Sequence, residues 1–188
     1  RVVGEINVAD GTCEFCKKGV PSQCSDRTTV GIDRHDGAMA DYLALATRNL
    51  YVVPGEVRDD AAVFVEPLAA ALQVTEAVHI SPRDRVLVVG VGKLGMLVAQ
   101  VLKLTGADVV ALIRRDKQAK LLDRWHIPYG ENGDFYDNTI DVVVDCTGTA
   151  EGFAISIGLV KPRGTVVLKS TYTGIPQADL TRVAIDEI

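Results

Sequence analysis

Two patterns of hydrophobic and polar positions follow one another along the chain and meet near residue 60. Before that point, short β-type runs are separated by Gly, Asp and Pro, which is typical of a small β domain. After residue 85, apolar runs of strand length alternate with helical segments, and this alternation predicts a parallel sheet with helices on both faces. We therefore expect two domains, residues 1–60 and 61–188, and an α/β fold for the second.

The same pattern places the individual elements. The β-type runs of the first domain are residues 1–6, 28–32, 38–46 and 50–53. A helical link with an early proline, Pro67, covers residues 61–77. The predicted strands of the sheet are residues 86–89, 108–113, 141–145 and 165–169, with helices near 93–104, 116–125 and 150–160. A further strand near residues 127–129 is poorly marked, and nothing convincing fills a sixth strand before Ile188.

A glycine-rich turn follows the first strand of the sheet. Residues 86–100 read VLVVGVGKLGMLVAQ, a buried strand that runs into Gly90-x-Gly92-x-x-Gly95 and then a helix. The first glycine permits a sharp turn, the second lets the backbone approach a pyrophosphate, and the third lets the helix pack on the strand. The helix N-terminus, with Lys93 and Leu94, would hold the negative charge. Dinucleotide binding is therefore favoured over a purely structural turn.

The end of the second strand indicates which dinucleotide binds. A NAD-type fold usually carries Asp or Glu there to hold the ribose hydroxyls, but this chain has Ile113, followed by Arg114 and Arg115. Guanidinium groups suit a 2′-phosphate, so we predict NADP. Two alternatives remain: a one-residue slip would bring Asp116 into the carboxylate position and restore NAD, and the two arginines could be a solvated helix start.

Composition narrows the class of protein. The 188 residues are 47% hydrophobic and 24% charged, as expected for a globular protein with a substantial core. A net charge of −5 gives no support for nucleic-acid binding, and no apolar stretch is long enough to cross a bilayer. No signal peptide is recognised, and because residue 1 is not Met we expect the natural N-terminus to be missing. Three cysteines crowd between Cys13 and Cys24, which suggests metal and a reducing, cytoplasmic compartment.

Six short motifs occur in a fixed order along the chain. They are residues 7–16 (NVADGTCEFC) with Cys24, 36–43 (DGAMADYL), 64–68 (FVEPL), 85–92 (RVLVVGVG), 144–148 (VDCTG) and 164–170 (GTVVLKS). Together they resemble the zinc-dependent medium-chain dehydrogenase/reductase (alcohol dehydrogenase-like) family, and the motif around Glu66 resembles that family's polyol-dehydrogenase branch. The resemblance implies a partial GroES-like β domain followed by a Rossmann doubly wound parallel sheet.

The resemblance also implies a structural zinc site in the first domain. The family has four cysteines in this lobe, whereas this chain reads Asp10-x2-Cys13-x2-Cys16-x7-Cys24. A carboxylate oxygen can bind zinc, so one Asp and three Cys form a reasonable, though weaker, tetrahedral set. The alternatives are a metal-free loop with three reduced cysteines or a stray disulfide.

Further site residues follow from the resemblance alone. Glu66 is expected to bind catalytic zinc, directly or through water; the alternative is a Glu stabilised at a helix N-terminus beside Pro67. The family's catalytic Cys and His, and the outer strands through which many members pair into oligomers, are expected outside residues 1–188. The remaining expected cofactor contacts are Cys146, Thr147, Gly148, Leu168 and Ser170.

The predicted activity is the interconversion of a polyol- or sugar-like secondary alcohol and its carbonyl, with NADP (or NAD) and zinc. With Glu66 as its single catalytic ligand candidate, residues 1–188 alone are expected to be inactive. One alternative is a zinc-free NADPH-dependent enone or quinone reductase, although that class normally lacks the cysteine lobe. Another is a catalytically inactive nucleotide-binding module. The expected partner is a small-molecule alcohol or carbonyl, with no nucleic acid or membrane, and the whole protein is expected to be a homo-oligomer.

Overall fold

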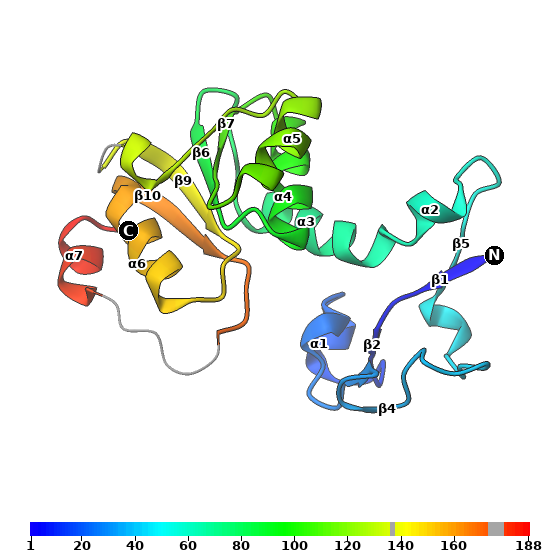
Figure 1. Ribbon diagram of the computed structural model, residues 1–188. Helices are drawn as coiled ribbons and strands as arrows, with labels where there is room; N and C mark the ends of the chain where they lie inside the picture. Colours follow the sequence, from blue (N-terminus) through cyan, green and yellow to red (C-terminus); the bar gives the residue numbers. More distant parts are fainter. Residues whose placement is uncertain (136–137, 173–178) are drawn as a thin grey trace. The chain divides into compact units, whose positions relative to one another are not determined.

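The computed structural model describes residues 1–135, 138–172 and 179–188 (Figure 1). The chain divides into an N-terminal unit, Arg1–Glu66, and a C-terminal unit, Pro67–Ile188. Within the described residues, no helix combines the length and the apolar character that a membrane span requires.

The C-terminal unit is built on a five-stranded sheet in which every strand pair is parallel. The spatial order is β10-β9-β6-β7-β8, so the chain starts in the middle, moves out to one edge, and then returns to fill the other side. This is the strand order of a Rossmann fold, and the predicted fold class is confirmed. The strands are β6 (Arg85–Val89), β7 (Asp108–Leu112), β8 (Tyr129–Gly130), β9 (Ile140–Asp145) and β10 (Val160–Leu168).

Helices cover both faces of this sheet. Successive side chains of a strand point to opposite faces, so a continuous apolar strand makes both faces apolar. On β6, Val86 and Val88 pack with helices on one face, and Leu87 and Val89 pack on the other. The first face is covered by α3 (Val65–Ala77), α4 (Lys93–Lys103) and α5 (Asp116–Arg124), and the second by α6 (Ala150–Leu159) (Figure 1). A short helix, α7 (Leu180–Ile185), and a 3₁₀ turn, η3 (Asn132–Asp134), complete the unit.

The edge strands differ from their predicted limits. The poorly marked strand is the two-residue β8, at 129–130 instead of 127–129. At the other edge, β10 begins at Val160, five residues earlier than predicted, because the segment KPRG looks like a turn in sequence. The pairing with β9 does shift register between Val160 and Thr165. Pro162 lies in this interval, and a proline has no backbone N–H to donate to the ladder.

The N-terminal unit contains two small sheets. Strand β1 (Val2–Gly4) pairs antiparallel with β5 (Leu50–Val52), and β3 (Thr28–Val30) lies between β2 (Asn7–Val8) and β4 (Arg34–His35). The buried Asn49 joins them, since its side-chain amide donates to the carbonyl oxygens of Glu5 (3.1 Å) and Asn7 (2.8 Å). Its remaining elements are α1 (Glu14–Lys17), α2 (Asp59–Ala62), η1 (Pro21–Gln23) and η2 (Thr47–Asn49).

One predicted strand is wrong. Residues 38–46 have β-type composition, but they form no strand in the described N-terminal unit. The side chains of Met39 and Tyr42 are almost fully exposed. A strand needs a neighbour to satisfy its backbone hydrogen bonds, and none of the strands of this unit runs beside the segment.

Candidate functional site

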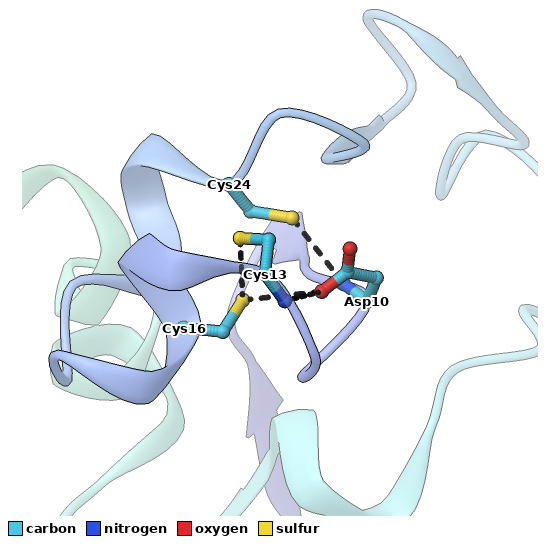
Figure 2. A group of neighbouring side chains, drawn as sticks. All are labelled: Asp10, Cys13, Cys16 and Cys24. Atoms are coloured by element: carbon cyan, nitrogen blue, oxygen red, sulfur yellow. Dashed lines mark hydrogen bonds between the residues drawn. The ribbon is translucent and has the colours of Figure 1, made fainter.

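The four residues predicted as zinc ligands lie together in the N-terminal unit. Cys13 is the N-cap of α1, Cys16 lies within that helix, and Cys24 directly follows η1, while Asp10 lies in the loop between β2 and α1. Figure 2 shows their side chains converging from these three segments. One potential ligand atom from each residue lies within 4.8 Å of all the others. Among the described residues this is the one group of His, Cys, Asp or Glu that could hold a metal ion.

Hydrogen bonds hold the Asp10 carboxylate in this cluster. Its Oδ1 accepts from the backbone N–H groups of Thr12 (2.6 Å) and Cys13 (3.0 Å), and the Sγ of Cys16 lies 3.4 Å away. The backbone N–H of Asp10 points to the Sγ of Cys24 at 3.5 Å. The carboxylate is therefore fixed by the turn that also presents Cys13.

The side chains of this cluster differ widely in pKa. The backbone N–H groups of Thr12 and Cys13 lower the pKa of Asp10 to about 2. A hydrogen bond from the backbone of Cys16 lowers the pKa of Cys13 to about 7, whereas burial and the neighbouring Cys13 raise the pKa of Cys16 to about 12. A divalent cation would favour the thiolate forms, since a coordinating thiol loses its proton. One carboxylate and three thiols at these separations are a donor set that fits zinc.

A second candidate site lies in the C-terminal unit, at the carboxyl ends of β6, β7 and β9. A cavity of about 300 Å³ opens there, and ligands of doubly wound folds bind in the crevice where the strand order reverses. The predicted cofactor residues that line it are Gly90, Gly92, Arg114, Arg115, Cys146 and Thr147.

The three glycines adopt the geometry that the motif predicts. Gly90 has a φ of +87°, in the left-handed region that side chains disfavour. A Cβ on Gly95 would lie 2.2 Å from the carbonyl oxygen of Gly90, so helix α4 packs closely against the turn. Gly92 is the N-cap of α4, with open space where a side chain would project. Lys93 and Leu94 lie in the first turn of α4 and do not line the cavity.

The loop after β9 is organised by Asp145, which sequence reasoning did not single out. This carboxylate is fully buried and accepts from the backbone N–H and the hydroxyl of Thr147, both at 2.7 Å, and from the hydroxyl of Tyr172. Burial and the neighbouring Asp145 raise the pKa of Tyr172, so its hydroxyl remains a donor. The signal in the sequence was a charged residue at the end of an apolar strand.

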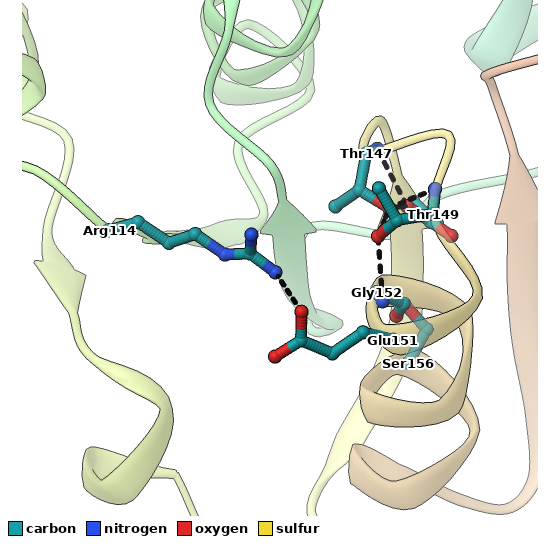
Figure 3. Close-up of polar contacts among 7 residues, drawn as sticks. Arg114, Thr147, Thr149, Glu151, Gly152 and Ser156 are labelled. Carbon is teal, nitrogen blue, oxygen red and sulfur yellow. Dashed lines mark hydrogen bonds and ion pairs between the residues drawn. The ribbon is translucent and has the colours of Figure 1, made fainter.

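The neighbours of Thr147 complete this loop. Gly148 has a φ of +65°, and a Cβ there would lie 2.8 Å from the carbonyl oxygen of Thr171. The hydroxyl of Thr149 caps α6 by accepting from the backbone N–H of Gly152 at 3.1 Å (Figure 3). Burial raises the pKa of Cys146 to about 12, so this thiol stays protonated and is no nucleophile at neutral pH.

The predicted 2′-phosphate site lies at the end of β7. Ile113 is buried, and Arg114 and Arg115 follow it at the cavity wall, with Arg115 as the N-cap of α5. The Nη2 atom of Arg114 lies 2.9 Å from the Oε2 atom of Glu151, and Figure 3 shows the two side chains extended toward each other. Sequence reasoning missed Glu151, which lies 37 positions away along the chain.

Gln118 on α5 is a further cavity residue that the motif did not indicate. Its side-chain amide donates to the carbonyl oxygen of Val91 (2.6 Å), and its carbonyl accepts from the backbone N–H of Arg114 (3.2 Å). Gln118 thereby links the glycine-rich turn to the arginine loop.

The remaining predicted residues lie outside these two clusters. Leu168 ends β10 with a half-exposed side chain, and Ser170 follows beside Gly148; neither lines the cavity. Glu66 lies in the first turn of α3, is exposed, and does not belong to the metal-ligand group of the described residues.

The sequence of this chain is similar to those of known dehydrogenases. No protein-family model matches the chain. It is 29% identical to the L-galactonate-5-dehydrogenase of Escherichia coli K12 over 89% of its length, and 28% identical to the L-threonine 3-dehydrogenase of Deinococcus deserti over 96%. The chain spans about half the length of these relatives, 52% and 54% respectively.

Solved structures agree with the sequence relatives. A Sinorhizobium meliloti protein assigned as a zinc-binding dehydrogenase, solved with NADP bound, superposes with a TM-score of 0.89 at 25% identity, covering all of this chain and 59% of that one. Acetophenone reductase from Geotrichum candidum, solved with NAD, shares the fold with a TM-score of 0.90 at 22% identity, covering 99% of this chain and 56% of that one. The predicted resemblance to zinc-dependent medium-chain dehydrogenases is confirmed.

Proposed function

We propose that this chain, which is related in sequence and fold to zinc-dependent medium-chain alcohol dehydrogenases, supplies the structural-zinc lobe and the cofactor domain of an NADP-dependent alcohol dehydrogenase. In this assignment residues 1–60 are the partial GroES-like domain and residues 61–188 the Rossmann domain. The observation that carries the proposal is the presence, in one chain, of a four-residue zinc donor set and a Rossmann crevice ending in two arginines.

The chain's own residues bind and orient the cofactor in this proposal. NADP, when bound, supplies the hydride acceptor for alcohol oxidation. The glycine turn at Gly90 and the N-terminus of α4 receive the pyrophosphate, because the backbone N–H groups there point at an anion. Arg114 and Arg115 hold the 2′-phosphate, and the loop from Cys146 to Gly148, with Leu168 and Ser170, positions the nicotinamide.

Zinc has two roles in this proposal. At Asp10, Cys13, Cys16 and Cys24 it cross-links the N-terminal lobe and takes no part in chemistry. At the catalytic site, Glu66 would hold zinc directly or through water, and the metal would supply Lewis-acid chemistry toward the substrate oxygen. Because a catalytic zinc needs three protein ligands and Glu66 is one, residues 1–188 alone should bind cofactor without turnover.

The substrate class that the proposal favours is a polyol- or sugar-acid-like secondary alcohol. Support comes from the Glu-Pro-Leu segment at residues 66–68 and from a relative that is an L-galactonate-5-dehydrogenase. We further propose a homo-oligomeric protein of the cytoplasm. A zinc-free reductase would not account for the cluster of one Asp and three Cys, so the zinc-dependent assignment is favoured.

A fluorescence titration tests the cofactor assignment. NADPH should bind the chain about tenfold or more tightly than NADH, because the 2′-phosphate gains charge-assisted hydrogen bonds from exposed arginines. Replacing both Arg114 and Arg115 with Gln should remove that difference while leaving NADH affinity unchanged. Equal affinities in the unsubstituted chain would contradict the NADP assignment.

A further inference from the structure

The guanidinium of Arg114 already has an anionic partner at the mouth of the cofactor crevice. Glu151 supplies it from the first turn of α6, at 2.9 Å, while Arg114 itself follows β7. Both side chains are more than half exposed, so the pair lies in solvent where a ligand phosphate could reach it. Arg115, by contrast, has no ion-pair partner among the described residues.

The carboxylate beside Arg114 comes from α6 and not from the end of β7. A NAD-type sheet carries its acidic residue at the end of the second strand, where this chain has the buried Ile113. Here the carboxylate reaches the same region from the opposite side of the crevice. A 2′-phosphate arriving at Arg114 would therefore meet Glu151 as a competitor for the guanidinium and as a like charge.

We propose that Glu151 determines cofactor specificity, by competing with the 2′-phosphate for Arg114 and so limiting the preference for NADP over NAD. This inference rests on the proposed function, because it takes the crevice as a dinucleotide site. The physical basis is that a 2′-phosphate at Arg114 must either displace Glu151 from the guanidinium or lie beside its negative charge. A ribose without the phosphate does neither.

Two small ligands test the proposal without any turnover. Adenosine 2′,5′-bisphosphate carries the 2′-phosphate, and ADP lacks it, so their affinities for the whole chain can be compared by isothermal titration calorimetry. Glu151→Gln keeps the shape of the side chain and removes its charge. The variant should bind adenosine 2′,5′-bisphosphate more tightly by a factor of about two to five, the range of an exposed ion pair, and should bind ADP unchanged. Glu76→Gln, an exposed carboxylate on α3, is the matched control and should change neither affinity.

A double-variant cycle separates competition for Arg114 from general electrostatics. In an Arg114→Gln background, Glu151→Gln should no longer tighten adenosine 2′,5′-bisphosphate. The same tightening without Arg114, an equal gain for ADP, or no gain at all would overturn the proposal. Glu151→Ala provides an independent second variant and should reproduce the effect.

Failure of the inference is distinguishable from failure of the proposed function. If Arg114→Gln weakens adenosine 2′,5′-bisphosphate but Glu151→Gln changes nothing, the crevice binds the 2′-phosphate and Glu151 is a bystander. If the unsubstituted chain binds adenosine 2′,5′-bisphosphate no better than ADP and Arg114→Gln has no effect, the NADP assignment and the role of Glu151 are both overturned.

Discussion

The two units of this chain are stabilised in different ways. In the C-terminal unit, two clusters of buried, mainly aliphatic side chains cover the two faces of the sheet. In the N-terminal unit, the buried hydrophobic residues are Ala9, Cys24 and Val53, and the strands are two or three residues long. Burial of apolar area is the main favourable contribution to folding, so the C-terminal unit has the means to fold by itself and the N-terminal unit has much less.

Polar contacts and the metal cluster take the place of a core in the N-terminal unit. Asn49 bridges the strand segments through its side-chain amide, and Asp10 anchors the cysteine loops. Small domains with insufficient cores commonly use a structural metal, whose binding free energy becomes folding free energy. The comparison teaches that zinc bound at the proposed site would substitute for buried apolar surface in this lobe.

Removal of zinc should therefore have the largest effect on stability, and it should affect the N-terminal unit alone. Treating the zinc-loaded chain with a chelator at neutral pH should open the N-terminal unit, because its apolar contacts alone are too few. Limited proteolysis should cleave within residues 1–66, while the fluorescence of Trp125, the single tryptophan, should stay unchanged in the C-terminal unit.

The matched variants are Cys24→Ser and Cys146→Ser. The first should mimic the chelator, and the second should not, because Cys146 lies outside the zinc cluster. Unchanged protection of residues 1–66 after complete loss of zinc would show that the lobe folds without metal.

Substitutions of buried apolar residues should destabilise the C-terminal unit more than the N-terminal unit, the reverse of zinc removal. Leu87→Ala removes a fully buried side chain from the centre of the sheet and should lower the free energy of unfolding of the C-terminal unit by about 2–5 kcal/mol. Val53→Ala in the N-terminal unit should have a smaller effect, about 1 kcal/mol, since Val53 belongs to neither hydrophobic cluster and few residues of this unit are buried. Urea titration followed by Trp125 fluorescence and by proteolysis measures both, and similar losses would refute the contrast.

Cofactor choice should respond to one residue of the C-terminal unit. Ile113→Asp places a carboxylate at the end of β7, where it can accept from ribose hydroxyls and repel a 2′-phosphate. The ratio of NADPH to NADH affinity should fall about tenfold, measured by fluorescence titration. Because Ile113 is buried, thermal unfolding must be compared first; Ile113→Asn serves as the control for size without charge.

The smallest expected effect concerns the pH dependence of zinc binding in the N-terminal unit. The low pKa of Asp10, about 2, means that this ligand does not take up a proton between pH 5 and 8, whereas the thiol of Cys13, with a pKa of about 7, does. Zinc affinity should fall as the pH drops through this range, as protons compete for the cysteines.

The variant Asp10→Cys should bind zinc more tightly at pH 8, because thiolate is the better zinc ligand. Its zinc affinity should also fall more steeply with falling pH, because up to about one additional proton is released when zinc binds. Competition with a metallochromic dye at several pH values measures both. An identical pH slope for the two proteins would show that Asp10 is not a ligand.

Local pattern was sufficient for much of this protein. The central strands, the helices between them and the left-handed turn at Gly90 were readable because each depends on residues close in sequence. The crowding of three cysteines between Cys13 and Cys24 was readable for the same reason, whereas the place of Asp10 beside them followed from the family resemblance. Such features are decided by backbone geometry and by alternation of apolar residues along one strand.

Other features depended on contacts between distant positions. Residues 38–46 satisfy the local pattern of a strand, yet they form none, because a strand exists only where a neighbour completes its hydrogen bonds. Asp145 meets Tyr172, and Arg114 meets Glu151, only after the sheet has ordered its strands. The sequence alone determined where the chain turns and what it buries, and the tertiary structure decided which charged groups face one another, since electrostatic contacts depend on distance in space and not on distance along the chain.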